Sequence, residues 1–180
     1  MTNFFSLAAS GNPVPVPPVT EQTVYCTGGR VRWTLSPGSA TEPTTNTVAG
    51  TRDGLVTTYD QAAGIADAGL AYSVGYAVST PAIVPGNVKL RLFCNGTGSE
   101  PQFFLLSAAY DNTVIAGSTE MVPATWTWYE FDIGEDDPAT GLPWTAAGVG
   151  SKLWGFSFDS DVASGITEFR CAEIELLIEL

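Results

Sequence analysis

The sequence contains no histidine and only seven basic residues, and these two shortages disfavour several classes of function. Histidine is the commonest general base, the usual proton carrier of serine and cysteine triads, and the commonest zinc ligand. The seven Lys and Arg residues stand against nineteen Asp and Glu residues, so the formal net charge is −12. Nucleic acids and anionic membranes are bound through clusters of Lys and Arg. We therefore expect a protein that is not an enzyme, holds no cofactor or metal, and binds neither nucleic acid nor membranes.

Cysteines and long apolar runs are also scarce. The three cysteines, Cys26, Cys94 and Cys171, form no short-spaced pair, and their odd number argues against the disulfide framework of a secreted protein. We interpret them as buried thiols of a protein made in a reducing cytoplasm. The short apolar run near the N-terminus has no preceding Lys or Arg, whereas a signal peptide begins with a positive region. We expect no export by a signal peptide and no membrane helix, which would need about eighteen uninterrupted apolar residues.

The residues that are present indicate one folded domain with an extension. At 180 residues, of which 44% are hydrophobic, the chain is long enough to bury one core. Residues 11–18, GNPVPVPP, alternate proline and valine, a composition typical of extended polyproline II that cannot join a sheet. We predict an extended arm over residues 1–20 and a single domain over residues 21–180.

Short runs rich in β-branched and aromatic residues fill that domain, and Gly, Pro, Asn and Asp separate them. Val88, Leu90 and Leu92 share one face of such a run. The clearest alternation is the last, which sets Ala172, Ile174, Leu176, Ile178 and Leu180 against Cys171, Glu173, Glu175, Leu177 and Glu179. One helix is expected, over residues 59–69. The pattern predicts an all-β fold, an antiparallel β-sandwich of jelly-roll type.

The stretch WTWYEFDIGEDD, residues 126–137, combines tryptophans with carboxylates. In a strand, successive side chains point to opposite faces. One face then carries Trp126, Trp128, Glu130 and Asp132, and the other, expected to face the core, carries Tyr129, Phe131 and Ile133. Three readings of the first face stay open: a neighbouring loop or subunit covers the tryptophans, a sugar stacks on them as in a carbohydrate-binding module, or the carboxylates are catalytic.

The catalytic reading rests on the order Glu-x-Asp-x-x-Glu. These six residues resemble the catalytic strand of laminarinase and lichenase-type jelly-roll glucanases. The resemblance implies that Glu130 is the nucleophile, that Asp132 tunes it, and that a bulge brings Glu135 round as acid/base. Retaining hydrolysis needs the two carboxyls about 5 Å apart. A second acidic stretch, DSDVASG at 159–165, departs from the EF-hand spacing, so we expect a solvated turn there.

The last third of the chain has a further resemblance, carried by ATWTWYEFDI, GLPWT, LWGFSF and FRCAEIELLIEL. These segments resemble the closing strands of β-sandwich proteins of tailed-bacteriophage virions. The resemblance implies a viral structural protein, either a head decoration, a minor capsid or a tail-associated protein. Such a protein is made in the host cytoplasm, resides in the virion and works through contacts rather than catalysis.

The residues expected to bind partners lie in the arm and on the tryptophan face. Extended arms make long contact lines, and proline lowers the entropy lost when they become ordered. The predicted partner-binding residues are Phe4, Phe5, Pro13, Pro15, Pro17, Pro18, Trp126 and Trp128. The expected partners are other virion proteins and further copies of the chain, with a glycan as the alternative.

Overall fold

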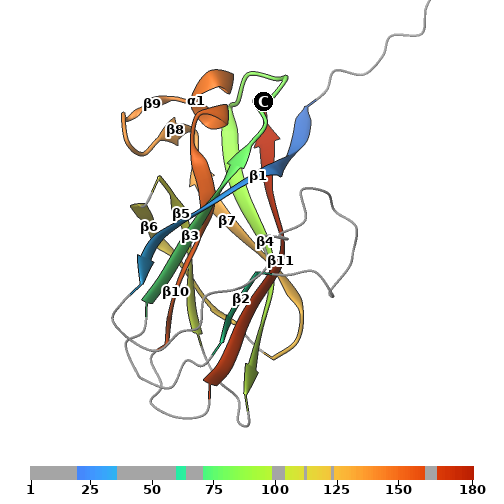
Figure 1. Cartoon of the computed structure of the whole chain (residues 1–180). Coiled ribbons are helices and arrows are strands. Elements are labelled where there is room, and N and C mark those ends of the chain that lie inside the picture. The colour runs from blue at the N-terminus through green and yellow to red at the C-terminus, as the bar shows by residue number, and fades with distance from the viewer. Residues whose placement is uncertain are drawn as a thin grey trace, which may run out of the picture.

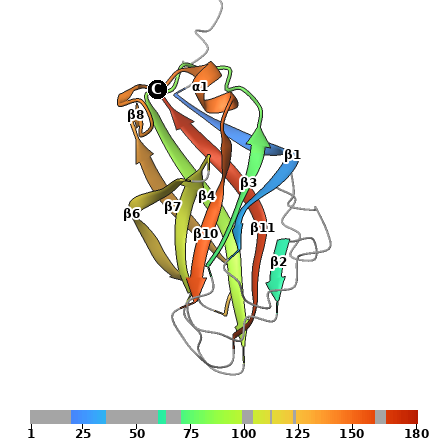
Figure 2. The same ribbon diagram turned by 60° about the vertical axis from the view of Figure 1, so that its left-hand side comes forward.

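The computed structural model describes residues 20–35, 60–63, 71–98, 104–111, 113–122, 124–160 and 166–180. Strands dominate these residues, and every strand pair is antiparallel. Figures 1 and 2 show the strands arranged in two layers. The predicted fold class, an all-β antiparallel sandwich, is therefore confirmed. The predicted arm, up to residue 19, lies outside the described residues.

Eleven strands and one short helix make up the described part of the chain. They are β1 (Glu21–Leu35), β2 (Asp60–Ala63), β3 (Ala71–Val78), β4 (Asn87–Gly98), β5 (Phe104–Tyr110), β6 (Thr113–Val122), β7 (Thr127–Gly134), β8 (Asp136–Asp137), β9 (Leu142–Pro143), α1 (Ala146–Gly150), β10 (Leu153–Ser160) and β11 (Ile166–Glu179).

The strand β1 joins the two layers because it changes partner along its length. Its first part, Glu21–Tyr25, pairs with β11, and from Cys26 onward it pairs with β3. The hydrogen-bonded order is β6-β5-β10-β3-β1-β11-β4-β7, and Figure 1 shows β1 crossing from one layer to the other. Where β1 leaves β11, the short strand β2 pairs with β11 instead, so the backbone groups of β11 keep their partners.

The core lies between the layers and is built from alternate residues of the facing strands. Nearly all of its members are less than a tenth exposed. One layer contributes Val24, Val88, Leu90, Leu92, Cys94, Tyr129, Phe131, Ile133, Cys171, Ile174, Leu176 and Ile178; the other contributes Val74, Tyr76, Val78, Ala108, Tyr110, Trp154 and Phe156. The predicted inward faces of residues 88–92 and 129–133 are thus confirmed.

The alternation predicted for the last strand is wrong at Cys171 and at Leu180, which was expected on the dry face but is 63% exposed. Cys171 opposes Cys94, whereas Glu173 opposes Phe93, so β11 has one residue more than β4 between these pairs. This register shift at Ala172 turns Cys171 onto the core face, although strict alternation places it among the glutamates. The face predicted to be charged is also less exposed than its sequence suggests, since Glu173 and Glu175 are only 3% and 1% exposed.

The helix predicted over residues 59–69 is wrong where the structure describes it. Residues 60–63 form strand β2, and the others lie outside the described residues. Pairing with the open edge of β11 outweighs the weak helical preference of a segment that contains two glycines. The helix that does form, α1, was not expected; the Thr145 hydroxyl caps its start by accepting from the Gly148 amide at 2.9 Å.

Two glycines allow backbone arrangements that other residues would strain. Gly155 of β10 opposes Gly75 of β3, and a Cβ at Gly155 would collide with the Val74 carbonyl. Gly134 ends β7 with a φ of +100°, at a register shift between β4 and β7. This turn carries the chain out of the sheet into the β8–β9 segment.

Candidate functional site

The outward face of β4, β7 and β11 carries the tryptophans and carboxylates singled out in the sequence. Glu130 and Asp132 are exposed, whereas Tyr129, Phe131 and Ile133 between and beside them are buried. Glu130 opposes Arg91 on β4, and Arg91 in turn opposes Glu175 on β11. This face therefore presents charged and aromatic side chains from three neighbouring strands.

Three aromatic rings gather at one end of this face, and we call Phe93, Trp126 and Trp128 the aromatic patch. The Phe93 ring stacks on Trp128 with centroids 5.1 Å apart and contacts Trp126 at 5.3 Å. The guanidinium of Arg91 lies 5.5 Å from the Trp128 ring centre, a cation–π distance. All three aromatic residues are half-buried. The fold thus brings Trp126 and Trp128 together through a third ring from the next strand.

A ladder of ion pairs continues from the aromatic patch along the same face. Arg91 donates to the Glu175 carboxylate at 2.8 Å, and its Nε lies 3.2 Å from Glu130. The two carboxylates differ in setting, because the Glu175 side chain is 1% exposed and the Glu130 side chain 45%. Arg91 therefore links a buried carboxylate to a surface one and is held in place beside Trp128.

The far end of the ladder is Lys89, which donates to Glu179 at 2.7 Å and lies 3.8 Å from Glu130. The hydrogen bond to Glu179 raises the pKa of Lys89, and the hydrogen bonds from Lys89 and then Asn87 lower the pKa of Glu179. Both groups are thereby held in their charged forms at neutral pH.

Two of the three carboxylates of the glucanase-like motif have protein partners. Glu130 is engaged by Arg91 and Lys89, and Asp132 accepts a hydrogen bond from the Gly134 amide at 3.1 Å. A register shift does occur between the Asp132 and Gly134 pairs, and Glu135 follows it as an exposed residue. Pairing of Glu130 with two cations favours a role in holding Arg91 and Lys89.

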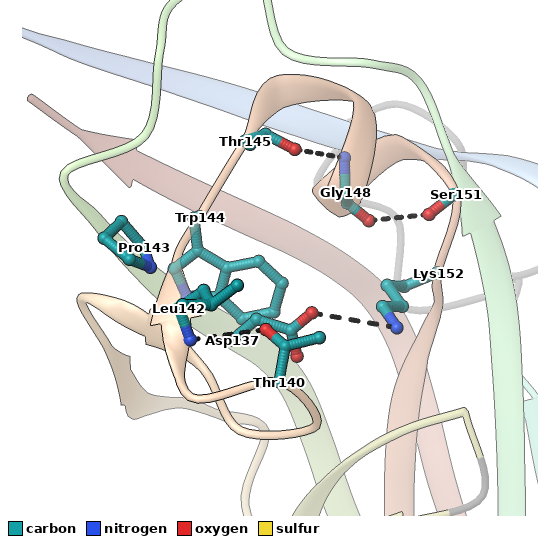
Figure 3. A pocket seen from close by; sticks show the side chains of 9 residues that line it. All are labelled: Asp137, Thr140, Leu142, Pro143, Trp144, Thr145, Gly148, Ser151 and Lys152. Carbon is teal, nitrogen blue, oxygen red and sulfur yellow. Dashed lines mark hydrogen bonds and ion pairs between the residues drawn. The ribbon is translucent and has the colours of Figure 1, made fainter.

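A second candidate site is a pocket of about 280 Å³ at the end of the sandwich where α1 lies (Figure 3). Its walls come from the β8–β9 segment, α1 and the two residues between α1 and β10. The lining residues are Asp137, Thr140, Leu142, Pro143, Trp144, Thr145, Gly148, Ser151 and Lys152. Lys152 points towards Asp137 across the pocket, as the dashed line in Figure 3 shows.

A polar cluster adjoins this pocket through Asp137 and Lys152, and we call Tyr110, Asp111, Asp137 and Lys152 the cap network. Lys152 Nζ lies 3.3 Å from Asp111 and 3.8 Å from Asp137, and 5.4 Å from the Tyr110 ring centre. Asp137 accepts from the Tyr110 hydroxyl at 3.1 Å and from the Ala139 amide at 2.9 Å. Burial, and next the bond to Asp137, raise the pKa of Tyr110 to about 12.

Two tryptophans fix the cap network to the core. The Trp144 and Trp154 rings contact each other at 5.5 Å, and each contacts Tyr110. Their indole N–H groups donate to the carbonyls of Gly134 and Val149, at 3.1 and 3.0 Å. Both rings are buried, and the pocket's polar side chains have internal partners. This arrangement is typical of a structural cap over the end of the core.

The sequence-predicted partner residues divide into two groups. Phe4, Phe5, Pro13, Pro15, Pro17 and Pro18 lie outside the described residues, so their role stays a prediction. Trp126 and Trp128 lie side by side on the outward face. In the described part of the chain, no three His, Cys, Asp or Glu side chains gather as a metal site would require, and no helix is long and apolar enough to cross a membrane.

Sequence reasoning missed Phe93, which completes the aromatic patch, and Arg91, which lies against its Trp128 ring. A signal was present: Lys89, Arg91 and Phe93 alternate with the core residues of the same strand, and so they share its outward face. The cap network had no such signal, because its residues come from the end of β5 and the turn after it, from β8, and from the position just before β10. Only the folded chain brings them together.

Comparison with known proteins adds no assignment to this geometry. The sequence matches no protein-family model, and no curated protein matches it either.

Proposed function

We propose that the chain is a non-enzymatic structural protein of a tailed-bacteriophage particle that works through protein contacts made by the aromatic patch. The observation that carries the proposal is the meeting of Phe93, Trp126 and Trp128 on one outward face, with Arg91 against Trp128. Tryptophan and arginine are the residues most enriched among those that dominate binding energy at protein interfaces.

The surroundings of the aromatic patch suit a contact surface. Phe93 and Trp128 belong to paired strands, so their positions are set by the sheet. Arg91 is restrained by Glu175 and Glu130, which lowers the entropy that it would lose on binding. Charged residues of the ladder lie beside the rings, as a polar rim lies beside the apolar centre of an interface. A rigid, aromatic and arginine-containing surface is thus already formed in the single chain.

The place in a virion is supported by the resemblance of the last third of the chain to closing strands of phage β-sandwich proteins. A head decoration, a minor capsid protein and a tail-associated protein all need a stable sandwich with an adhesive face. The net charge of −12 keeps free subunits apart and soluble until a specific surface captures them. Self-association through the aromatic patch, or docking on another virion protein, would complete the assembly.

A sugar-binding role ranks second. Phe93 stacks on Trp128 and Arg91 lies over its ring, so the protein itself already supplies partners to this tryptophan. A sugar would need an open aromatic face of its own. These contacts favour a protein partner over a glycan.

The first experiment measures self-association of the purified chain by sedimentation velocity, together with the Trp128→Ala variant. We expect a concentration-dependent oligomer that weakens at least about tenfold in the variant, since truncating a central interface aromatic costs about 2 kcal/mol or more. Leu142→Ala, at an exposed apolar residue of β9 outside the aromatic patch, is the control and should associate like the parent.

The virion role is tested separately by looking for peptides of the chain in purified phage particles from cells that produce it. Particles that carry stoichiometric amounts of the chain support the role, and its restriction to the soluble fraction would contradict it. A glycan array with the same Trp128→Ala variant, and a β-glucan hydrolysis assay with Glu130→Gln, test the two alternatives. Binding or turnover that is lost in the variant would replace the structural proposal.

A further inference from the structure

Cys94 and Cys171 are opposed across the antiparallel strands β4 and β11. They form one register pair of these two strands, and both are reduced cysteines with no exposed surface. Both belong to the same buried core cluster, so their side chains lie on the same side of the sheet. The third cysteine, Cys26, lies on β1 and pairs with Val78 of β3.

The register shift in β11 is what makes the two thiols share a face. Cys94 continues the inward series Val88, Leu90 and Leu92 on β4. On β11 the inward series runs back from Ile178 through Leu176 to Ile174, and an unbroken alternation would then place Ala172 inward and Cys171 outward. The extra residue at Ala172 shifts the pattern by one, and Cys171 takes the place opposite Cys94.

We propose that Cys94 and Cys171 are a redox modification site that closes to an intramolecular disulfide between β4 and β11. Opposed residues of an antiparallel pair have Cα atoms about 4.5 to 5.5 Å apart. Disulfides span Cα separations of about 4.4 to 6.8 Å, with Cβ atoms directed towards each other. The register and the shared face of this pair, together with the separation that opposed residues ordinarily have, therefore suit a disulfide between the two strands.

The reaction with a small disulfide such as oxidised glutathione balances in two exchanges. The Cys94 or Cys171 thiolate attacks the glutathione disulfide, which forms a mixed disulfide and releases one glutathione thiol. The second cysteine thiolate then attacks the protein sulfur of the mixed disulfide, and the second glutathione thiol leaves. The two cysteines are oxidised, the glutathione disulfide is reduced, and the two cysteine protons end on the two glutathione thiols.

Burial controls the rate of this reaction. Neither thiol is exposed, and the Cys171 thiol lies 3.6 Å from the Glu173 carbonyl as a weak donor. The oxidant must therefore wait for β4 and β11 to open locally. We expect slow oxidation in buffer and much faster oxidation at a urea concentration just below the unfolding transition. Once the disulfide has formed, β4 and β11 should pair again as in the native fold.

The test oxidises the full chain with oxidised glutathione in sub-transition urea, removes urea, blocks remaining thiols and digests with trypsin. Cleavage after Arg170 releases a peptide beginning at Cys171, cleavage after Arg91 releases the Cys94 peptide, and cleavage after Arg30 separates Cys26. We expect the first two peptides to be joined, and the chain to stay monomeric and to lose about 2 Da on oxidation, measured before the remaining thiol is blocked. The melting temperature should rise by about 5 to 15 °C, because the bond closes a long loop of the unfolded chain.

Two variants act as controls. Cys26→Ser should still form the bond, and Cys94→Ser should abolish both the joined peptides and the rise in melting temperature. The proposal is overturned if both thiols stay free after oxidation, if Cys26 or a second chain supplies the partner, or if the bond lowers the melting temperature. Peptide mapping of the parent chain decides the matter even where a variant does not fold.

Discussion

The aromatic patch and the cap network are built from the same kinds of residue in opposite settings. In each, a cation lies about 5.5 Å from an aromatic ring and is shared between two carboxylates: Arg91 at Trp128, and Lys152 at Tyr110. The patch rings are half-buried on the outward face of a sheet, whereas Tyr110 and the tryptophans around it are buried at the end of the core. Burial, not residue type, separates the proposed contact surface from the structural support at the end of the core.

The difference predicts where mutations act. Removing a side chain from the cap region should cost stability, because its rings fill space in the core and its polar groups satisfy each other. Removing a ring from the aromatic patch should cost association more than stability. Replacing Arg91 should affect both stability and association, since Arg91 links buried Glu175 to the surface.

The largest expected effect is that of Trp154→Ala. Trp154 is fully buried, contacts Tyr110 and Trp144, and donates its indole N–H to Val149. Its removal leaves a large cavity and should lower the free energy of unfolding by about 3 to 5 kcal/mol, measured by urea denaturation. Trp128→Ala, from the aromatic patch, should cost clearly less. Equal losses for both tryptophans would break the distinction between the two regions.

The next effect is that of Arg91→Met, which keeps an apolar stem but removes the cation from buried Glu175. We expect a loss of about 2 to 3 kcal/mol in the free energy of unfolding, because a charged hydrogen bond disappears and the carboxylate stays buried. Glu130→Gln, at the exposed end of the ladder, should cost less than about 1 kcal/mol. The double variant Arg91→Met/Glu175→Leu should recover most of the loss; a further loss would contradict this account.

Tyr110→Phe should cost about 1 to 2 kcal/mol at pH 8, since Asp137 loses one donor but keeps the Ala139 amide and Lys152. It should also change the pH dependence. The pKa of Tyr110 is about 12 in the fold against an ordinary 10.0, so its contribution is complete below pH 10 and is lost as the pH rises towards 12. The melting temperatures of the parent and the variant, measured between about pH 9 and 12, should therefore converge as the pH rises. Parallel curves would refute the assignment.

The smallest effect is expected for the half-buried pair Lys89 and Glu179. The lowered pKa of Glu179 means that its contribution is present above pH 4.5 and fades as the pH falls through the folded value. The raised pKa of Lys89 makes its contribution complete below pH 10.5. Because the pair is accessible to solvent and salt, Lys89→Met should leave the melting temperature nearly unchanged at neutral pH. A marked drop would show that the ladder acts as one unit.

Much of the fold could be predicted from alternation alone. The inward faces of β4 and β7 follow directly from their sequences, since a strand with one buried face must place apolar residues at every second position. The failures are places where pairing overrides local pattern. Residues 60–63 form a strand because β11 offers an open edge. The register shift at Ala172 moves Cys171 to the core face, and the sequence of β11 alone does not show where that shift occurs.

Only part of the candidate site could be predicted from the sequence. Trp126 and Trp128 stand out in the sequence as large aromatics on one face of a strand, but their partners Phe93 and Arg91 are more than thirty positions away. Which strand lies beside β7 depends on the whole sheet order. The same holds for the cap network, where Tyr110, Asp137 and Lys152 meet only because β5 pairs with β10 and the β8–β9 segment folds over them.

The sequence by itself determined an acidic, histidine-free, all-β chain and the inward faces of its strands, because composition and period-two alternation are local properties. The tertiary structure alone decided which outward residues meet, which carboxylates are buried, and that Cys94 faces Cys171. Those outcomes depend on strand order and register, and both are set by the packing of the two layers as a whole.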